Sequence, residues 1–171
     1  MKKLLLLSVI ALVTIGVRAQ DEDKSKRPSP PAKVTETTSS GTVITIDYSQ
    51  PAVKGREIGK EIAPFGKVWR TGANEATTFE VSKEVKIEGK SLPAGKYGLF
   101  TIPNKAEWVI IFNKTPQQWG AYKYAEADDA LRVTVSPTKA PSFTERMTFT
   151  VDKSGKVTLL WGNEAVAFTV K

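Results

Sequence analysis

The segment from Trp69 to Glu75 concentrates side chains that are well suited to bind a small polar molecule. Arg70, Asn74 and Glu75 supply a guanidinium, an amide and a carboxylate, and Gly72 between them lets the backbone turn. A guanidinium donates in a planar fork to carboxylates or sugar hydroxyls, an amide both donates and accepts, and an indole ring offers a stacking face. We therefore predict a ligand-binding site here. The alternative is an ion pair between Arg70 and Glu75 that holds the loop, in which case Asn74 caps a turn and Trp69 belongs to the core.

A second polar and aromatic segment follows the apolar run at residues 108–112. It contains Trp119 and Tyr122 beside the amides of Gln117 and Gln118. Aromatic faces meet sugar C–H groups and amides meet hydroxyls, so this composition fits the rim of a carbohydrate site. Large aromatic side chains also tend to bury most of their area, which favours packing over the open end of the fold.

The residue types that are missing from the chain exclude much catalytic chemistry. The 171 residues contain neither Cys nor His. A thiol nucleophile, a Cys/His zinc site, a Ser-His-Asp triad and an imidazole base are therefore ruled out. A hydrolase of envelope polymers that uses Glu75 as acid or base is an alternative function. It requires a second carboxylate or a tyrosine within about one water of Glu75.

Neither a metal nor a nucleic acid is expected as a partner. The acidic run at residues 126–129 lacks the alternating ligands and the glycine of a calcium loop, so we expect a solvated acidic turn, no metal site and no cofactor. From residue 34 onward the chain has 18 basic and 15 acidic residues. A nucleic-acid binder normally shows a larger and clustered basic excess.

The N-terminus has the layout of a secretory signal peptide. Lys2 and Lys3 precede an apolar stretch over residues 4–17, and the small Ala19 fits a signal-peptidase site. We expect cleavage after Ala19 and export to the periplasm or beyond. A membrane anchor is the weaker alternative, because a spanning helix needs roughly 20 apolar residues. Residues 20–33, QDEDKSKRPSPPAK, are charged and rich in proline, and we expect a disordered or extended linker there.

The rest of the chain, residues 34–171, shows the period-two alternation of antiparallel strands with one solvated face. Alternating runs occupy residues 44–48, 78–82, 85–88, 131–136, 147–152, 157–161 and 166–170. Residues 108–112, WVIIF, are apolar on both faces, which indicates a central strand covered on each side. Short helices are plausible only at residues 57–62 and 116–124. Nine or ten short strands predict a single all-β domain, an antiparallel β-sandwich or jelly roll with minimal helix.

Several longer motifs resemble those of a family of bacterial secreted proteins, the domain of unknown function 2911. The motifs are YSQP at residues 48–51, PFGKVWRTGANEA at 64–76, LPAG at 92–95 and WG at 119–120. The resemblance covers about residues 34–171 and implies export by a Gram-negative bacterium. It implies no reaction and no catalytic residue. It does imply that a recurrent polar motif of the family lies on the segment from Trp69 to Glu75.

These observations predict a secreted or periplasmic, non-catalytic binding module for a small polar ligand or a glycan fragment. The predicted site comprises Trp69, Arg70, Asn74 and Glu75, with Trp119 and Tyr122 at its rim. A structural or assembly role in the cell envelope, in which the long loop before residue 76 docks a protein, is the second alternative.

Overall fold

The computed structural model describes residues 23–171. Ten strands run through these residues: β1 (Pro31–Thr37), β2 (Val43–Ser49), β3 (Thr77–Val81), β4 (Val85–Ile87), β5 (Lys90–Leu92), β6 (Gly95–Ile102), β7 (Trp108–Asn113), β8 (Asp129–Val135), β9 (Thr138–Val151) and β10 (Lys156–Thr169). Helix within the described residues is limited to two 3-10 turns, η1 (Lys24–Lys26) and η2 (Glu126–Asp128). The predicted signal peptide, residues 1–19, and residues 20–22 of the predicted linker lie outside the described residues.

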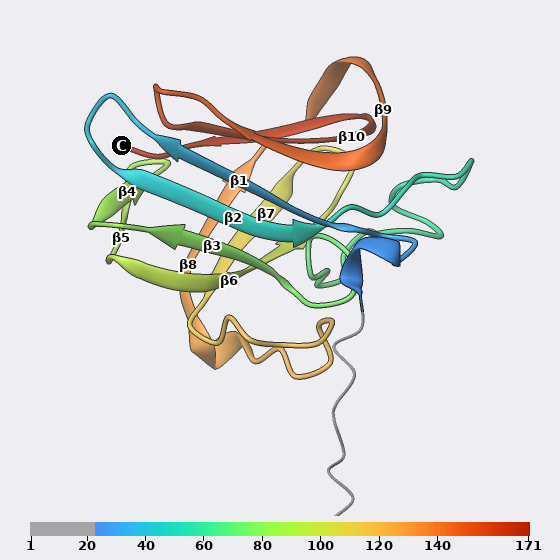
Figure 1. The fold of residues 1–171 in the computed structure, drawn as a ribbon, viewed down its shortest axis with the longest axis horizontal. Helices are drawn as coiled ribbons and strands as arrows, with labels where there is room; N and C mark the ends of the chain where they lie inside the picture. Colours follow the sequence, from blue (N-terminus) through green and yellow to red (C-terminus); the bar gives the residue numbers. More distant parts are fainter. Residues whose placement is uncertain (1–22) are drawn as a thin grey trace, which may run out of the picture.

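The strands form two antiparallel layers (Figure 1). The larger layer is a six-stranded sheet in the order β1-β2-β3-β6-β7-β8. The β9-β10 ribbon and the β4-β5 hairpin make up the other layer, and a bridge between Ile87 of β4 and Val170 beyond β10 joins them. The sheets do not close into a barrel. The prediction of an all-β sandwich is confirmed.

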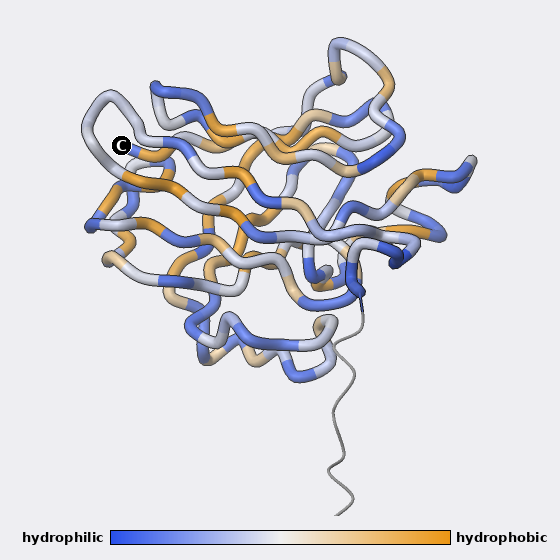
Figure 2. Tube along the Cα trace, viewed as in Figure 1, coloured by the Kyte–Doolittle hydropathy of each residue, from blue (hydrophilic) through white to orange (hydrophobic). Residues whose placement is uncertain are grey.

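Inward-facing side chains of both layers form the core. Phe79 of β3, Phe112 of β7 and Phe168 of β10 meet edge to face, with ring centroids 5.0, 5.7 and 5.9 Å apart. The alternation of hydrophobic and hydrophilic positions along β2 and β3 in Figure 2 matches their buried and exposed faces. Fully burying one Phe-sized side chain contributes about 1.5–3 kcal/mol, so a core of this kind supports the fold without disulfide bonds.

β7 is covered on both faces, as its sequence predicts. Phe112 faces the main core between the two layers. Ile111, on the opposite face, forms a smaller cluster with Phe100 of β6. Ala121 and Tyr124 from the connection between β7 and β8 pack against this smaller cluster, and the Phe100 and Tyr124 ring centroids lie 5.1 Å apart. The segment that carries Trp119 and Tyr122 is thus attached to the outer face of the six-stranded sheet.

The C-terminal part of the fold differs from the prediction. Residues 157–161 and 166–170 alternate like two separate strands, but β10 continues through both runs as far as Thr169. Gly162 adopts a left-handed φ of 57°, and the pairing register with β9 shifts on each side of it. Gly162 therefore makes a bulge in a continuous strand, where the sequence suggests a break.

The two short helices expected at residues 57–62 and 116–124 are not formed, and this prediction was wrong. Gly59 has a φ of 92° and Gly120 a φ of 67°, both outside the helical region. Residues 58 and 62 instead form an isolated bridge. Backbone turns at glycine decide the conformation of both segments.

Residues 23–33 also differ from the disordered or extended linker expected over residues 20–33. η1 occupies Lys24–Lys26, and β1 begins at Pro31, which is paired with Ser49 of β2. The domain therefore begins before residue 34. Composition alone does not indicate this order, because these residues contribute few apolar side chains and are held mainly by strand pairing and by the ion pairs described below.

Within residues 23–171, no helix has the length and the apolar character needed to cross a membrane.

Candidate functional site

Trp69 lies in the core of the sandwich. Its side chain is 8% exposed and stacks on Trp161 of β10, with ring centroids 5.2 Å apart and planes 10° from parallel. Trp108 of β7 meets it edge to face at 6.3 Å. The Trp69 backbone exchanges two hydrogen bonds with Thr101 of β6, at 2.8 and 2.9 Å. Trp69 thus anchors the start of the predicted site to both layers.

The backbone after Trp69 is held in a tight, partly left-handed course. Thr71 and Asn74 have φ values of 53° and 59°, which non-glycine residues rarely adopt. The hydroxyl of Thr77 donates to the carbonyl of Thr71 at 2.7 Å. A Cβ at Gly72 would lie 2.9 Å from that Thr77 hydroxyl and 3.2 Å from the carbonyl oxygen of Ser49. Gly72 is therefore needed for close approach to β2, and backbone strain of this kind is often retained at binding sites.

Arg70 is half-buried, and its side chain forms no hydrogen bond or ion pair with residues 23–171. Its Nε atom is buried without a hydrogen-bond acceptor, and no ion pair involves its guanidinium. The alternative of an ion pair between Arg70 and Glu75 is thus not realised. Burial lowers the pKa of the Arg70 guanidinium from its ordinary value, and the interaction with the Tyr122 hydroxyl opposes this effect.

Arg70 lines a cavity of about 430 Å³, which we call the Arg70 cavity. Two further residues of the predicted site, Trp69 and Asn74, also line it. The remaining wall consists of Ser29, Pro51, Arg56, Glu61, Ile62, Ala63, Pro64, Gly72, Ala73 and Trp161. Arg70, Arg56, Glu61 and Asn74 supply polar groups to this wall, beside the apolar surface of the prolines and of Trp69.

Asn74 closes one side of the cavity. Its amide nitrogen donates to the carbonyl of Ser29 at 3.1 Å and to the hydroxyl of Ser49 at 3.3 Å. The Asn74 carbonyl accepts from the backbone N–H of Gly120 at 3.0 Å. Asn74 therefore ties together the N-terminal segment, β2 and the connection that carries Trp119.

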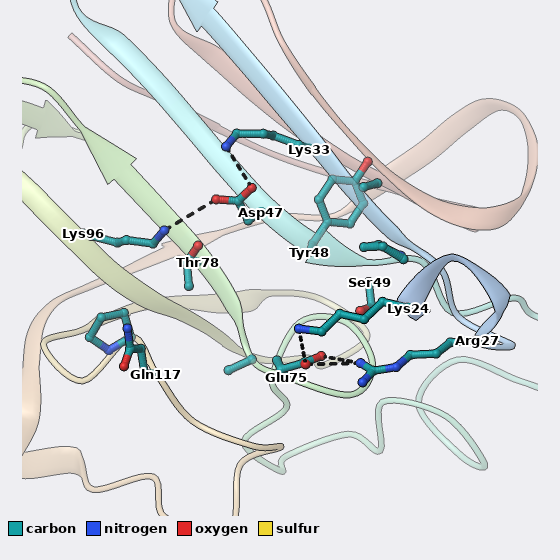
Figure 3. A pocket seen from close by; sticks show the side chains of 14 residues that line it. Lys24, Arg27, Lys33, Asp47, Tyr48, Ser49, Glu75, Thr78, Lys96 and Gln117 are labelled. Atoms are coloured by element: carbon teal, nitrogen blue, oxygen red, sulfur yellow. Dashed lines mark hydrogen bonds and ion pairs between the residues drawn. The ribbon is translucent and has the colours of Figure 1, made fainter. Parts of the chain in front are cut away.

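Glu75 does not line the Arg70 cavity. It lines a second, larger groove of about 590 Å³ (Figure 3). Its carboxylate is bound by Lys24 at 3.1 Å and by Arg27 at 3.0 Å. Burial alone would raise the pKa of the Glu75 carboxyl, but the hydrogen bonds from its own backbone, Lys24 and Arg27 outweigh this and lower the pKa. Glu75 is thus held as an anion by the N-terminal segment.

A second carboxylate lies in the same groove with its own pair of cations (Figure 3). Asp47 of β2 is 3.3 Å from Lys33 and 3.5 Å from Lys96. Thr78 lies on the sheet surface beside Asp47, and its buried hydroxyl has no hydrogen-bond partner. The groove therefore carries four cationic and two anionic side chains, with both anions already paired.

Trp119 lies on the Glu75 side, whereas Tyr122 contacts neither carboxylate. Trp119 forms a backbone bridge with Glu75, is 59% exposed, and has the Arg27 guanidinium 5.9 Å from its ring centroid. Tyr122 is 85% exposed. The structure thus separates the six predicted residues. Trp69, Arg70 and Asn74 line the Arg70 cavity, Glu75 lines the groove with Trp119 bridged to it, and the exposed Tyr122 lines neither.

The connection carrying these two aromatics is fixed by a cluster around Asp129. Its carboxylate accepts hydrogen bonds from Arg132 at 2.6 Å, Tyr124 at 2.6 Å and Asn113 at 2.9 Å. The Asp129 side chain is only 8% exposed. Burial and the hydrogen bond to Asp129 raise the pKa of Tyr124 to about 12.

Sequence reasoning missed Lys24, Arg27, Asp47 and Trp161 as neighbours of the site. The alternating pattern predicts only that Trp161 is an inward-facing position of its strand and that Asp47 is an outward-facing position of its strand. Lys24 and Arg27 lie in the segment expected to be a linker. No local signal could have found them, because each meets the site through a contact between distant parts of the chain. Within residues 23–171, no group of three or more acidic side chains is arranged to hold a metal ion.

The protein is thus an all-β sandwich with a half-buried arginine at one small cavity and a separate charged groove. The chain belongs to the family described as Protein of unknown function (DUF2911), whose model matches residues 29–170. The family resemblance read from the motifs is thereby confirmed. No curated protein and no solved structure matches the chain.

Proposed function

We propose that this protein is a non-catalytic binding module that takes a small polar molecule or a glycan fragment into the Arg70 cavity. The observation that carries the proposal is that the Arg70 guanidinium lines this cavity without an acceptor from residues 23–171. A partly desolvated guanidinium gains from any ligand that supplies oxygen acceptors.

The size and lining of the cavity support the same function. Its volume of about 430 Å³ falls within the roughly 300–1,000 Å³ that small-molecule sites occupy. The stacked rings of Trp69 and Trp161 provide a rigid wall, and Arg70 and Asn74 provide the polar groups.

The hydrolase alternative finds less support in the groove. Two cations hold Glu75 and its pKa is lowered, so it is ionised at neutral pH and cannot act as a general acid. None of residues 23–171 offers Glu75 a hydrogen bond from a second carboxyl group or a tyrosine hydroxyl. We therefore place ligand binding, and not hydrolysis, first.

Export is part of the proposal. The layout of residues 1–19 supports a cleaved signal peptide, which would deliver the domain to the periplasm or beyond. Fractionation of cells that express the full chain, followed by N-terminal sequencing, tests this. A mature N-terminus at Gln20 in the periplasmic or secreted fraction supports export, and an intact cytoplasmic chain contradicts it.

Thermal unfolding of the purified protein against envelope glycans, amino acids, small carboxylates and neutral sugars tests the binding function. A ligand at about 100 times its dissociation constant stabilises the folded state by about 2.7 kcal/mol, which is readily visible as a shift in Tm. We expect the shift to disappear in Arg70→Gln and in Asn74→Gly, because glycine tolerates the left-handed backbone at position 74 while removing the amide. Lys67→Gln is the matched control, since Lys67 is exposed on the same loop and does not line the cavity. If a ligand shifts Tm equally in the wild type and in all variants, the ligand binds outside the Arg70 cavity.

A further inference from the structure

The groove of about 590 Å³ lies across the outer face of the six-stranded sheet. On this face Asp47 of β2 lies between Lys33 of β1 and Lys96 of β6 (Figure 3). The N-terminal segment lines one part of the groove, and Pro116 and Gln117 of the connection between β7 and β8 line another. The groove and the Arg70 cavity share no lining residue, so the proposed function leaves the groove without a role.

Cations outnumber anions at the groove. The cationic side chains that line it are Lys24, Arg27, Lys33 and Lys96. Two carboxylates, Asp47 and Glu75, line it as well, and each is held between two of these cations. Glu80, 3.8 Å from Lys96, adds a third carboxylate beside the groove, which leaves four cations against three anions. The groove therefore favours an anionic ligand over a neutral or cationic one.

Three of the four cations are accessible to a ligand. The Arg27 side chain is only 14% exposed and donates to both oxygens of Glu75, so it belongs to the wall of the groove. The side chains of Lys24, Lys33 and Lys96 are between 43% and 61% exposed. Exposed ion pairs contribute little to stability, and a lysine ammonium is carried on a flexible stem. These lysines can therefore turn toward a ligand anion at small cost.

The accessible surface between the charges is mostly apolar. It comes in part from four small side chains of the lining, Pro31, Ala32, Ala76 and Pro116. Trp119 lies next to this surface, because its backbone bridges to Glu75, and its indole is exposed. An exposed indole offers a face on which the C–H side of a sugar ring can stack. The groove thus combines a surface for sugar rings with accessible positive charge.

We propose that the groove is a second binding site, and that its ligand is an anionic oligosaccharide. The anionic groups bind Lys33 and Lys96, and the C–H faces of the sugar rings cover the apolar surface and the Trp119 indole. The exposed Gln117 amide hydrogen-bonds with sugar hydroxyls at the same edge. The volume of about 590 Å³ lies within the roughly 300–1,000 Å³ of small-molecule sites. This inference is independent of the function proposed for the Arg70 cavity.

Titration of the 15N-labelled protein with matched anionic and neutral oligosaccharides tests the inference. Trigalacturonate is compared with its methyl ester and sulfated maltotriose with maltotriose, so that a carboxylate and a sulfate are each tested on one sugar backbone. Hexaglutamate carries negative charge on a peptide. We expect at least one anionic oligosaccharide to shift the Trp119 indole N–H and the Lys33 and Lys96 amides. Its dissociation constant should be at least about tenfold below those of its neutral counterpart and of hexaglutamate. The buried Trp161 indole serves as an internal reference.

Variants of exposed residues locate the bound oligosaccharide. Lys33→Gln and Lys96→Gln should each weaken binding by up to about fivefold, because each removes one exposed charge. Trp119→Ala should weaken it by about tenfold through the loss of stacking. Lys86→Gln is the matched control, since Lys86 is an exposed lysine of β4 that does not line the groove. Arg70→Gln should also leave the affinity unchanged.

Four outcomes would overturn the inference. Equal binding of a neutral counterpart would contradict the requirement for charge, and equal or tighter binding of hexaglutamate would indicate a site for acidic peptides. Affinity that falls in Arg70→Gln but not in Lys33→Gln or Lys96→Gln would move the oligosaccharide to the Arg70 cavity, which overturns the second site and supports the proposed function. No shift of the Trp119 indole with any oligosaccharide at about 10 mM would exclude the groove as a site, whatever the Arg70 cavity binds.

Discussion

The carboxylate of Glu75 lies 3.0 Å from the guanidinium of Arg27, 48 residues earlier in the chain. Glu75 belongs to the loop that sequence composition marks as a site, and Arg27 belongs to the segment that composition marks as a linker. Together with Lys24, Arg27 forms a latch that fastens the N-terminal segment over the groove (Figure 3).

Glu75→Gln should loosen the N-terminal segment with little effect on overall stability. The Glu75 side chain is 42% exposed, and exposed ion pairs contribute only about 0–1 kcal/mol. We expect the amide protons of Lys26 and Arg27 to exchange up to about fivefold faster, which corresponds to ~1 kcal/mol. Hydrogen exchange followed by NMR measures this. Glu80→Gln breaks an equally exposed pair with Lys96 and is the control; equal acceleration in both variants would argue against a latch.

The latch should weaken as the solution becomes acidic. The folded-state pKa of Glu75 is lowered from the ordinary value of 4.5, so its carboxylate contributes stability that is fully present above pH 4.5. That contribution is lost as pH falls through the lower, folded-state pKa. The difference in Lys26 exchange between wild type and Glu75→Gln should therefore be constant near neutrality and shrink below pH 4.5. A difference that grows on acidification would contradict the assignment.

Asp129→Ala should destabilise the protein by about 1–3 kcal/mol, because it removes the buried acceptor shared by the Tyr124 hydroxyl and the Asn113 amide, while Arg132 keeps its ion pair with Glu126. Urea denaturation measures the change. Asp128→Ala removes a neighbouring exposed carboxylate and should stay within about 0.5 kcal/mol of wild type. Similar losses in the two variants would show that the cluster around Asp129 does not anchor the connection.

Truncation of Trp69 should cost much more stability than truncation of Trp119. Trp69→Ala should cost about 3–5 kcal/mol of stability, because it leaves a cavity beside Trp161 and Trp108. Trp119 is 59% exposed, so Trp119→Ala should change stability by less than about 1 kcal/mol. The unfolding midpoints of the two variants compare them directly. A small effect of Trp69→Ala on stability would show that Trp69 contributes little to the core.

The period-two alternation of the chain determined much of the fold. In an antiparallel sheet with one buried face, a local pattern of side chains suffices to show where a strand runs, and β2, β3 and β8 follow their predicted runs. For β9 the predicted run, residues 147–152, covers only the end of a strand that begins at Thr138. The double-sided apolar run of residues 108–112 likewise indicated that β7 is covered on both faces. The family motifs identified the chain, and the loop from Trp69 to Glu75 does line cavities.

Tertiary structure alone decided how that loop is used. Asn74 ties the loop to Ser49 and Ser29, and this separates Arg70 from Glu75 into different cavities although they are five positions apart. Glu75 meets Arg27, and Trp69 meets Trp161 92 positions later. Local sequence patterns report which face of a strand is buried. They carry no information about which distant side chain will satisfy a given charge or N–H group, because that depends on how the two layers and the N-terminal segment pack together.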